Sequence, residues 1–181
     1  GSIVSKPINF THKKLIDYSY SEYQSDFLDI FIPAHCKFVI SSGGSGATDV
    51  AAVSFDRPML GVNIAEFGCT PLTRNSLYIP KKYKYSDTGK YLHFKDAEKM
   101  GNLWNNPTIF GLETEDNSPQ DILEATKEML ARLENRFSYS PESELLIQAY
   151  HKLWGESDVV ARLSKTPIGL AWLKKNRDLF F

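Results

Sequence analysis

The stretch that decides the fold runs from Phe38 to Asp49 and reads FVISSGGSGATD. The compact apolar run at 37–40 is typical of a strand buried on both faces, and a turn of serines and glycines follows it. Residues 48–55 then have the small apolar spacing of a closely packed helix. A second apolar run, at 58–63, comes after that helix. This order of strand, glycine turn, helix and strand predicts an α/β fold, with a parallel sheet covered by helices on both faces.

The serine and glycine turn has the features of an anion site. Glycine lets the backbone approach a ligand closely, and the first N–H groups of a helix are unpaired and carry partial positive charge. The sequence therefore predicts that a phosphate group binds there, and the alternative is a tight turn without a ligand. The predicted phosphate-binding residues are Ser42, Gly43, Gly44, Ser45, Gly46, Ala47 and Thr48.

The turn does not match the common phosphate-binding motifs. It lacks the GxxxxGK[ST] pattern, which excludes a P-loop NTPase. Asp49 stands where the third glycine of GxGxxG would be, which argues against an ordinary dinucleotide site. No Asp-x-Asp triplet occurs in the chain, so a metal-bridged diphosphate is unsupported. The sequence accordingly predicts neither a metal nor another cofactor.

The same turn also admits a hydrolase. The letters GGSGA resemble a relaxed GxSxG nucleophile elbow, which would make Ser45 the nucleophile of an α/β-hydrolase-like esterase. Asp87 or Asp116 followed by His151 would supply the acid and the base in the order that this class uses. However, His151 is expected in the middle of a helix and His93 at a strand edge, so the hydrolase is the third alternative.

Polar residues beyond the later strands extend the candidate site. Asn63 and Glu66 follow the second strand, and ligands of open α/β sheets bind beyond the carboxyl ends of the strands. Residues 74–90 hold five basic side chains, one acid and three tyrosines. Such a segment can neutralise a diphosphate and stack on a base, and the alternative is a solvated basic loop. The candidate pocket residues are Asp49, Asn63, Glu66, Tyr78, Lys81 and Lys82.

Composition bounds the class of protein. The chain has 181 residues, of which 42% are hydrophobic and 24% charged, with a net charge of −1. These values exclude a disordered or collagen-like chain and give no basic excess for nucleic-acid binding. Two cysteines, Cys36 and Cys69, exclude a disulfide scaffold and fit a reducing compartment. The longest apolar stretch, 27–40, is interrupted by charged residues and cannot cross a bilayer. We expect a cytoplasmic protein, free or peripheral at the inner face of the membrane.

The remaining elements divide the chain into two parts. A short strand is expected at 15–18 and a helix at 26–35. Three later helices are expected to start at Ser118-Pro119, Ser140-Pro141 and Thr166-Pro167, since serine or threonine before proline is typical of a helix N-terminus. The sequence thus predicts an α/β core at 3–115 and a helical segment at 116–181 that packs on it.

Taken together, these segments resemble a family of bacterial glycosyltransferases associated with surface-polysaccharide synthesis. The resemblance is specific at 17–29 and extends to 36–41, to the glycine turn, and to the segments 57–60, 77–81 and 167–169. That family is similar to the GT-B glycosyltransferases, in which two Rossmann-like domains face a cleft. The resemblance implies that this chain is the C-terminal, donor-binding half. It also implies that the turn holds the diphosphate of a nucleotide sugar, and that Asn63, Glu66 and residues 78–81 line the donor pocket.

The resemblance further implies a reaction and its partners. A sugar would pass from a nucleotide diphosphate sugar to a glycan or lipid-linked acceptor. An N-terminal domain of the same polypeptide would precede Ile3, and the opening Gly1-Ser2 looks like a cloning remnant. No catalytic residue is assigned, and the turn is richer in glycine than the family's usual one. The alternative from another class is a nucleotide-sugar or phosphate-binding module without catalysis.

Overall fold

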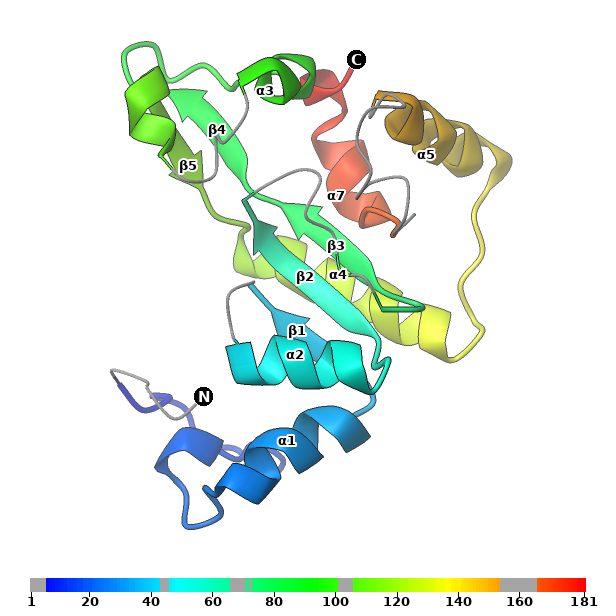
Figure 1. Ribbon diagram of the computed structural model, residues 1–181. Helices are drawn as coiled ribbons and strands as arrows, with labels where there is room; N and C mark the ends of the chain where they lie inside the picture. The colour runs from blue at the N-terminus through cyan, green and yellow to red at the C-terminus, as the bar shows by residue number, and fades with distance from the viewer. Residues whose placement is uncertain (1–5, 43–45, 66–70, 72, 101–105, 154–165) are drawn as a thin grey trace.

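A three-stranded parallel sheet organises the molecule (Figure 1). The computed structural model describes residues 6–42, 46–65, 71, 73–100, 106–153 and 166–181. The strands are β1 (Val39–Ser41), β2 (Met59–Ile64) and β3 (Leu77–Pro80), in the order β1-β2-β3. β1 pairs with β2 from Val39 opposite Met59, and β2 pairs with β3 from Leu60 opposite Leu77. The predicted parallel arrangement of the first two strands is confirmed.

Helices lie on opposite sides of this sheet. In Figure 1, α2 (Gly46–Ser54) lies in front of β1, and α4 (Pro119–Leu133) passes behind β2 and β3. α1 (Asp26–His35) packs against α2. The chain is therefore a mixed α/β protein with a parallel sheet between helices, as the sequence predicts at this level.

The other elements surround this centre. A two-stranded antiparallel sheet is formed by β4 (Lys82–Tyr85) and β5 (Leu112–Glu115). Among the described residues, the remaining helices are α3 (Phe94–Met100), α5 (Pro141–Leu153) and α7 (Leu170–Lys175). Short 3-10 helices span Tyr18–Tyr20, Pro107–Phe110 and Arg177–Leu179.

The start of α4 shows how local sequence fixes an element. The Ser118 hydroxyl accepts a hydrogen bond from the Asp121 backbone N–H, and the Asp121 carboxylate accepts one from the Ser118 N–H. This capping box satisfies two N–H groups that a helix start leaves unpaired. Pro119 occupies the first helical position, where its missing N–H costs nothing. Ala125 and Met129, four residues apart, then bury one face of the helix.

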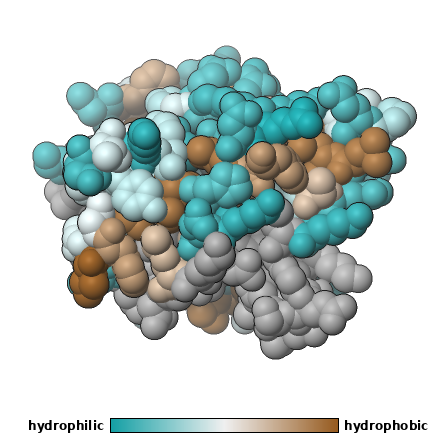
Figure 2. Space-filling model, turned by 90° about the horizontal axis from the view of Figure 1, so that it is seen from above, coloured by the Kyte–Doolittle hydropathy of each residue, from teal (hydrophilic) through white to brown (hydrophobic). Residues whose placement is uncertain are grey.

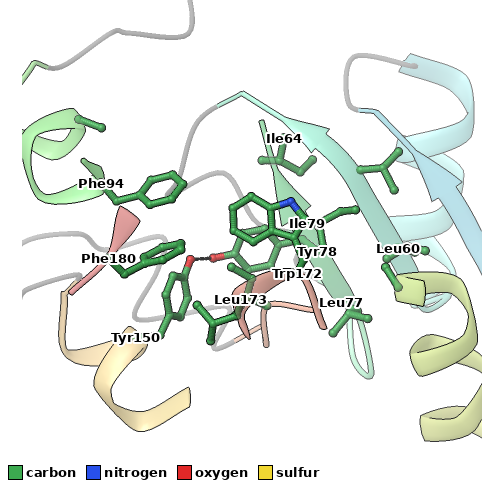
Figure 3. Close-up of a cluster of buried hydrophobic side chains, with 14 of the residues drawn as sticks. Leu60, Ile64, Leu77, Tyr78, Ile79, Phe94, Tyr150, Trp172, Leu173 and Phe180 are labelled. Carbon is green, nitrogen blue, oxygen red and sulfur yellow. Dashed lines mark hydrogen bonds between the residues drawn. The ribbon is translucent and has the colours of Figure 1, made fainter. Parts of the chain in front are cut away.

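An aromatic cluster joins the sheet to the later helices (Figure 3). The Tyr78 hydroxyl, from β3, hydrogen-bonds the Tyr150 hydroxyl of α5, as the dashed line shows. Phe180 stacks on Phe94 with ring centroids 4.0 Å apart, and Trp172 of α7 lies beside both rings. Residues before and after position 116 thus share one core cluster, which aromatic pairs of this geometry stabilise beyond their burial.

The predicted strand at 15–18 is wrong. The structure has a 3-10 helix at Tyr18–Tyr20 and no strand at 15–17. Local hydrogen bonds take the place of strand pairing: the Asp17 carboxylate accepts from the Ile8 N–H at 2.8 Å, and the Ser21 hydroxyl donates to the Tyr18 carbonyl at 2.8 Å. Short polar side chains bonded in this way favour turns over ladders.

The predicted helix start at Thr166-Pro167 is also displaced. α7 begins only at Leu170. The Tyr78 N–H donates to the Pro167 carbonyl at 3.2 Å, and the Gly169 N–H donates to the Tyr78 carbonyl at 2.8 Å. Residues 167–169 therefore run parallel to β3 before the helix starts, because the free edge of β3 offers backbone partners that a solvated helix start lacks.

Candidate functional site

The parallel sheet brings three chain segments to one edge, because parallel strands end on the same side. β1 ends at Ser41, shortly before α2 starts at Gly46. β2 ends just beyond Asn63, and β3 ends at Pro80, directly before Lys81. This carboxyl edge is the candidate site, and it is the place where the sequence predicts a ligand.

The described part of the glycine turn is open. Ser42 and Gly46 are exposed, and a Cβ atom added at Gly46 would meet no atom within 4 Å. α2 starts at Gly46 and contains positions 47 and 48 of the predicted turn. Gly43, Gly44 and Ser45 lie outside the described residues. The N-terminal turn of α2 therefore has room beside it at the edge of the sheet.

Two asparagines lock the end of β2 to the start of α4. The Asn63 N–H donates to Asn117 Oδ1, and the Asn117 N–H donates to Asn63 Oδ1, both at 2.6 Å. Asn117 Nδ2 also donates to the Pro80 carbonyl at 2.8 Å. Asn63 has a φ of 53°, a left-handed conformation that asparagine adopts more readily than most residues. One buried side chain thus holds the ends of β2 and β3 and the start of α4 together.

Asn117 was missed by the sequence analysis. Its side chain pairs with a residue 54 positions away, so no local pattern reveals the contact. The only signal is its place directly before the N-cap Ser118, where a polar residue can reach back to the sheet.

Lys81 lies at the same edge and is partly neutralised. Its ammonium pairs with Asp116 Oδ1 at 2.7 Å, and its side chain is 24% exposed. Its backbone N–H donates to the Ile64 carbonyl at 2.9 Å, which fixes the chain beside the end of β2. An ammonium has three N–H donors, so Lys81 can keep its ion pair with Asp116 and still donate a hydrogen bond to an anion.

Lys82 belongs to a different cluster. Its ammonium pairs with Glu115 and lies 4.5 Å from the centre of the Tyr91 ring. Burial works against the charge of Lys82, but hydrogen bonds to Glu115 and Tyr91 raise its pKa overall. The same Lys82 contact lowers the pKa of Glu115. The ion pair of Lys82 therefore stabilises the pairing of β4 with β5, and Lys82 is not part of the candidate site.

The three other predicted pocket residues lie in different places or outside the described residues: Tyr78, Asp49 and Glu66. Tyr78 is 2% exposed, because all four positions of β3 are buried, and its hydroxyl contacts Tyr150. It offers no surface to a ligand in this conformation. Asp49 lies half-buried in the first turn of α2. Glu66 lies outside the described residues. The structure thus gathers Ser42, Gly46, Asn63 and Lys81 at one edge and places Tyr78 in the core.

The residues of the hydrolase alternative lie on separate elements. Asp116 pairs with Lys81 at the sheet edge. His151 lies in the last turn of α5, not in the middle of a helix as expected, and Asp87 is exposed in the turn after β4. His93 falls between a bridge at Tyr91 and the start of α3. Ser45 itself is outside the described residues, so the triad stays a prediction.

The described residues contain neither a metal-binding cluster nor a membrane-spanning helix. Among them, no group of three or more His, Cys, Asp or Glu side chains could hold a metal ion. No described helix is long and apolar enough to cross a membrane.

Comparison of the chain with models of protein families, with curated proteins and with solved structures found no match. The class of protein is therefore defined by the fold alone, as a mixed α/β protein with a parallel sheet. The carboxyl edge of that sheet lies beside the start of α2, Asn63, Lys81 and the start of α4.

Proposed function

We propose that this chain is the donor-binding half of a GT-B-like glycosyltransferase, with a Rossmann-like core that binds a nucleotide diphosphate sugar at the carboxyl edge of the sheet. The observation that carries the proposal is the position of four elements at that edge: the start of α2, Asn63, Lys81 and the start of α4. Ligands of open α/β sheets bind at such edges.

The charges at the edge suit a diphosphate. The N-terminal amides of α2 carry partial positive charge, and the open space at Gly46 lets an anion approach them. Lys81 adds a full positive charge, held in place by Asp116. Donors that are already oriented stabilise the charge that develops on a leaving diphosphate. The proposed reaction therefore needs no divalent metal.

Asn63 suits a hydroxyl of the ribose or of the sugar. Its Oδ1 is taken by the Asn117 N–H, which fixes the orientation of the amide. The Nδ2 group is not used in that pair, and an amide nitrogen has two donors. Asn63 would therefore bind the donor, while Asn117 acts on the ligand only by positioning Asn63.

Sugar transfer also needs a base within about 3 Å of the acceptor hydroxyl and a cleft that excludes water. In the proposal, another domain supplies both, together with the glycan or lipid-linked acceptor. We therefore expect these 181 residues to bind nucleotide sugar weakly and to transfer no sugar alone. Turnover comparable to that of a longer polypeptide, with the same donor and acceptor, would contradict this division.

Gly46→Ala tests the binding site. The added methyl group would meet no atom within 4 Å, and Gly46 has no left-handed φ that alanine would strain, so the variant should fold. A diphosphate seated on the first turn of α2 would collide with it. Calorimetry with nucleotide sugars and a chelator should show at least a tenfold weaker affinity, whereas Val53→Ala, at an exposed position of the same helix, should bind normally.

Two results would overturn the proposal. Equal affinity of the Gly46→Ala variant would place the ligand elsewhere. Labelling of Ser45 by a fluorophosphonate, abolished in Ser45→Ala, would favour the hydrolase instead.

A further inference from the structure

The two outer edges of the parallel sheet differ. On the β3 side, residues 167–169 run along the strand and exchange backbone hydrogen bonds with Tyr78, which closes that edge. On the β1 side, no further strand follows among the described residues, because the order is β1-β2-β3. β1 is the lowermost strand in Figure 1, with α1 below it. Within the described part of the chain, the sheet therefore ends there on an open strand edge.

Ile40 presents its backbone to this open edge. The Val39 N–H donates to the Pro58 carbonyl at 3.0 Å, so the backbone of Val39 points towards β2. Neighbouring residues of a strand direct their N–H and C=O groups to opposite sides, and those of Ile40 therefore point away from β2. Such groups are a template for pairing with another strand. Ile40 thus offers one donor and one acceptor to an added strand.

The side chain of Ile40 also reaches the surface. Val39 packs with Ala52 of α2, and successive side chains lie on opposite faces of a sheet. Ile40 therefore lies on the other face, where α4 packs on β2 and β3, and it is 48% exposed. Natural edge strands are often protected by a charged residue or a proline, and Val39–Ser41 contains neither. The backbone and the side chain of Ile40 thus both suit a neighbouring strand with apolar side chains.

The position of α1 leaves room for that strand. α1 packs beside α2, with Pro33 and Ala34 buried, and no strand lies behind it in Figure 1. A helix is about 10 Å wide, which is the width of about two strands spaced about 4.8 Å apart. α1 therefore extends the layer of helices past β1, over a place that no described strand fills. Phe27 and Phe31 of α1 are 68% and 41% exposed, so apolar surface is available beside the open edge.

We propose that the free edge of β1 binds one extended strand of a partner polypeptide. The Ile40 N–H and C=O groups each form a hydrogen bond with the partner backbone, and apolar side chains of the partner contact Ile40 and α1. This mode of recognition adds a strand to an existing sheet. It uses none of the residues that bind the donor in the proposed function, so the two proposals are independent.

A second copy of this chain does not fit the same edge. Two β1 strands that pair antiparallel about a two-fold axis keep the helices of both copies on the same face of the joined sheet. Because α1 already lies beyond β1, it would occupy the place of α2 of the second copy. The partner is therefore a strand that brings no helix onto that face.

The backbone of β1 selects the class of partner, which other apolar surface does not. Apolar side chains also reach the surface on the upper side of the molecule, between hydrophilic ones (Figure 2). Scattered apolar side chains are normal on a protein surface and do not define a partner. The outward N–H and C=O groups of Ile40 do define one, because an extended strand matches their spacing.

A peptide library tests the proposal with the chain as it exists. Random heptapeptides displayed on phage are selected on the folded chain, and the tightest binder is synthesised. We expect apolar residues and no central proline in its sequence, because proline cannot donate to a ladder. The same peptide with every backbone nitrogen methylated keeps its side chains and loses its N–H donors. It should bind about tenfold more weakly or worse.

Two variants locate the peptide on the chain. Ile40→Lys places a charge at the edge, as protected edge strands do, and keeps the backbone that pairs with β2. It should weaken binding by about tenfold or more. Ile109→Lys is the matched control, because Ile109 is 74% exposed in the 3-10 helix beside β5, and it should leave affinity within about twofold. Circular dichroism should show that both variants fold, and hydrogen exchange at 37–41 should slow when the peptide binds.

Several results would overturn the proposal. A library that yields no binder would show that the edge accepts no strand. Equal binding of the methylated peptide would show that apolar contact alone holds it. Equal affinity of the wild type and Ile40→Lys would place the peptide elsewhere, and equal loss in Ile109→Lys would show a general effect of charge. A wild-type dimer in sedimentation velocity that Ile40→Lys dissociates would show that a second copy occupies the edge.

Discussion

Replacing Asn117 with alanine should loosen the carboxyl edge of the sheet. The substitution removes two hydrogen bonds, one from the Asn63 N–H at 2.6 Å and one to the Pro80 carbonyl at 2.8 Å. It leaves a backbone donor and a backbone acceptor without partners, and Asn117 itself is only 7% exposed. An unsatisfied buried group costs about 1–3 kcal/mol. Since Asn63 is half-buried and water can reach part of it, we expect a loss of about 2–4 kcal/mol in the free energy of unfolding.

Urea unfolding followed by circular dichroism measures this loss. For a chain of this size it corresponds to a fall of about 5–15 °C in the melting temperature. Asn106→Ala is the matched control, because Asn106 is exposed and, within the part of the chain that the structure describes, its side chain accepts only from the nearby Thr108 hydroxyl. Such a surface change should stay within about 0.5 kcal/mol. If Asn117→Ala were equally mild, the asparagine pair would not hold the edge together, and Asn63 would need another support.

Two further predictions concern buried positions. Gly169→Ala should destabilise the fold by about 1–3 kcal/mol in urea unfolding, because the added Cβ would lie 2.8 Å from Cγ2 of the fully buried Ile79, and an unchanged midpoint would show that Ile79 can move. Burial raises the pKa of Glu128 above its ordinary value of 4.5, against the hydrogen bond from Arg132 that lowers it. A raised folded pKa contributes stability that is full below pH 4.5 and is lost as the pH rises through the folded pKa. The stability of the wild type relative to Glu128→Gln should therefore increase from pH 7 towards pH 4.5, and a difference that is flat or reversed would contradict the assignment.

Much of the core could be predicted from the sequence. The helix at 26–35 and the strand–turn–helix–strand order after it are confirmed, with α2 starting two residues earlier than expected. The start of α4 was also predicted correctly, since the capping box lies within four consecutive residues. These features depend on neighbours along the chain, through hydrophobic period and capping, so the local pattern is enough.

The candidate site was predicted only in part. The edge of the sheet follows from the strand order, and the segments that carry Ser42, Gly46, Asn63 and Lys81 end or start there. That these residues bind a ligand stays a prediction. The basic and aromatic pattern at 74–90 was less informative, because a lysine next to a tyrosine occurs both in loops and in paired strands. The pattern therefore does not distinguish the two structures. The pattern could not show that Lys82 would pair with Glu115 across the small sheet.

The sequence by itself determined α1, α2, the starts of α4 and α5, and the first two parallel strands, because each depends on residues close together in the chain. Only the tertiary structure decided which polar and aromatic residues are available. Tyr78 is unavailable because the strand that carries it is buried throughout and Tyr150, 72 residues later, meets its hydroxyl. Residues 167–169 are extended because β3 offers them backbone partners. Asn117 holds the edge because the fold brings it to Asn63, across 54 residues. Contacts of this kind depend on the closure of long loops, and no local period or propensity records them.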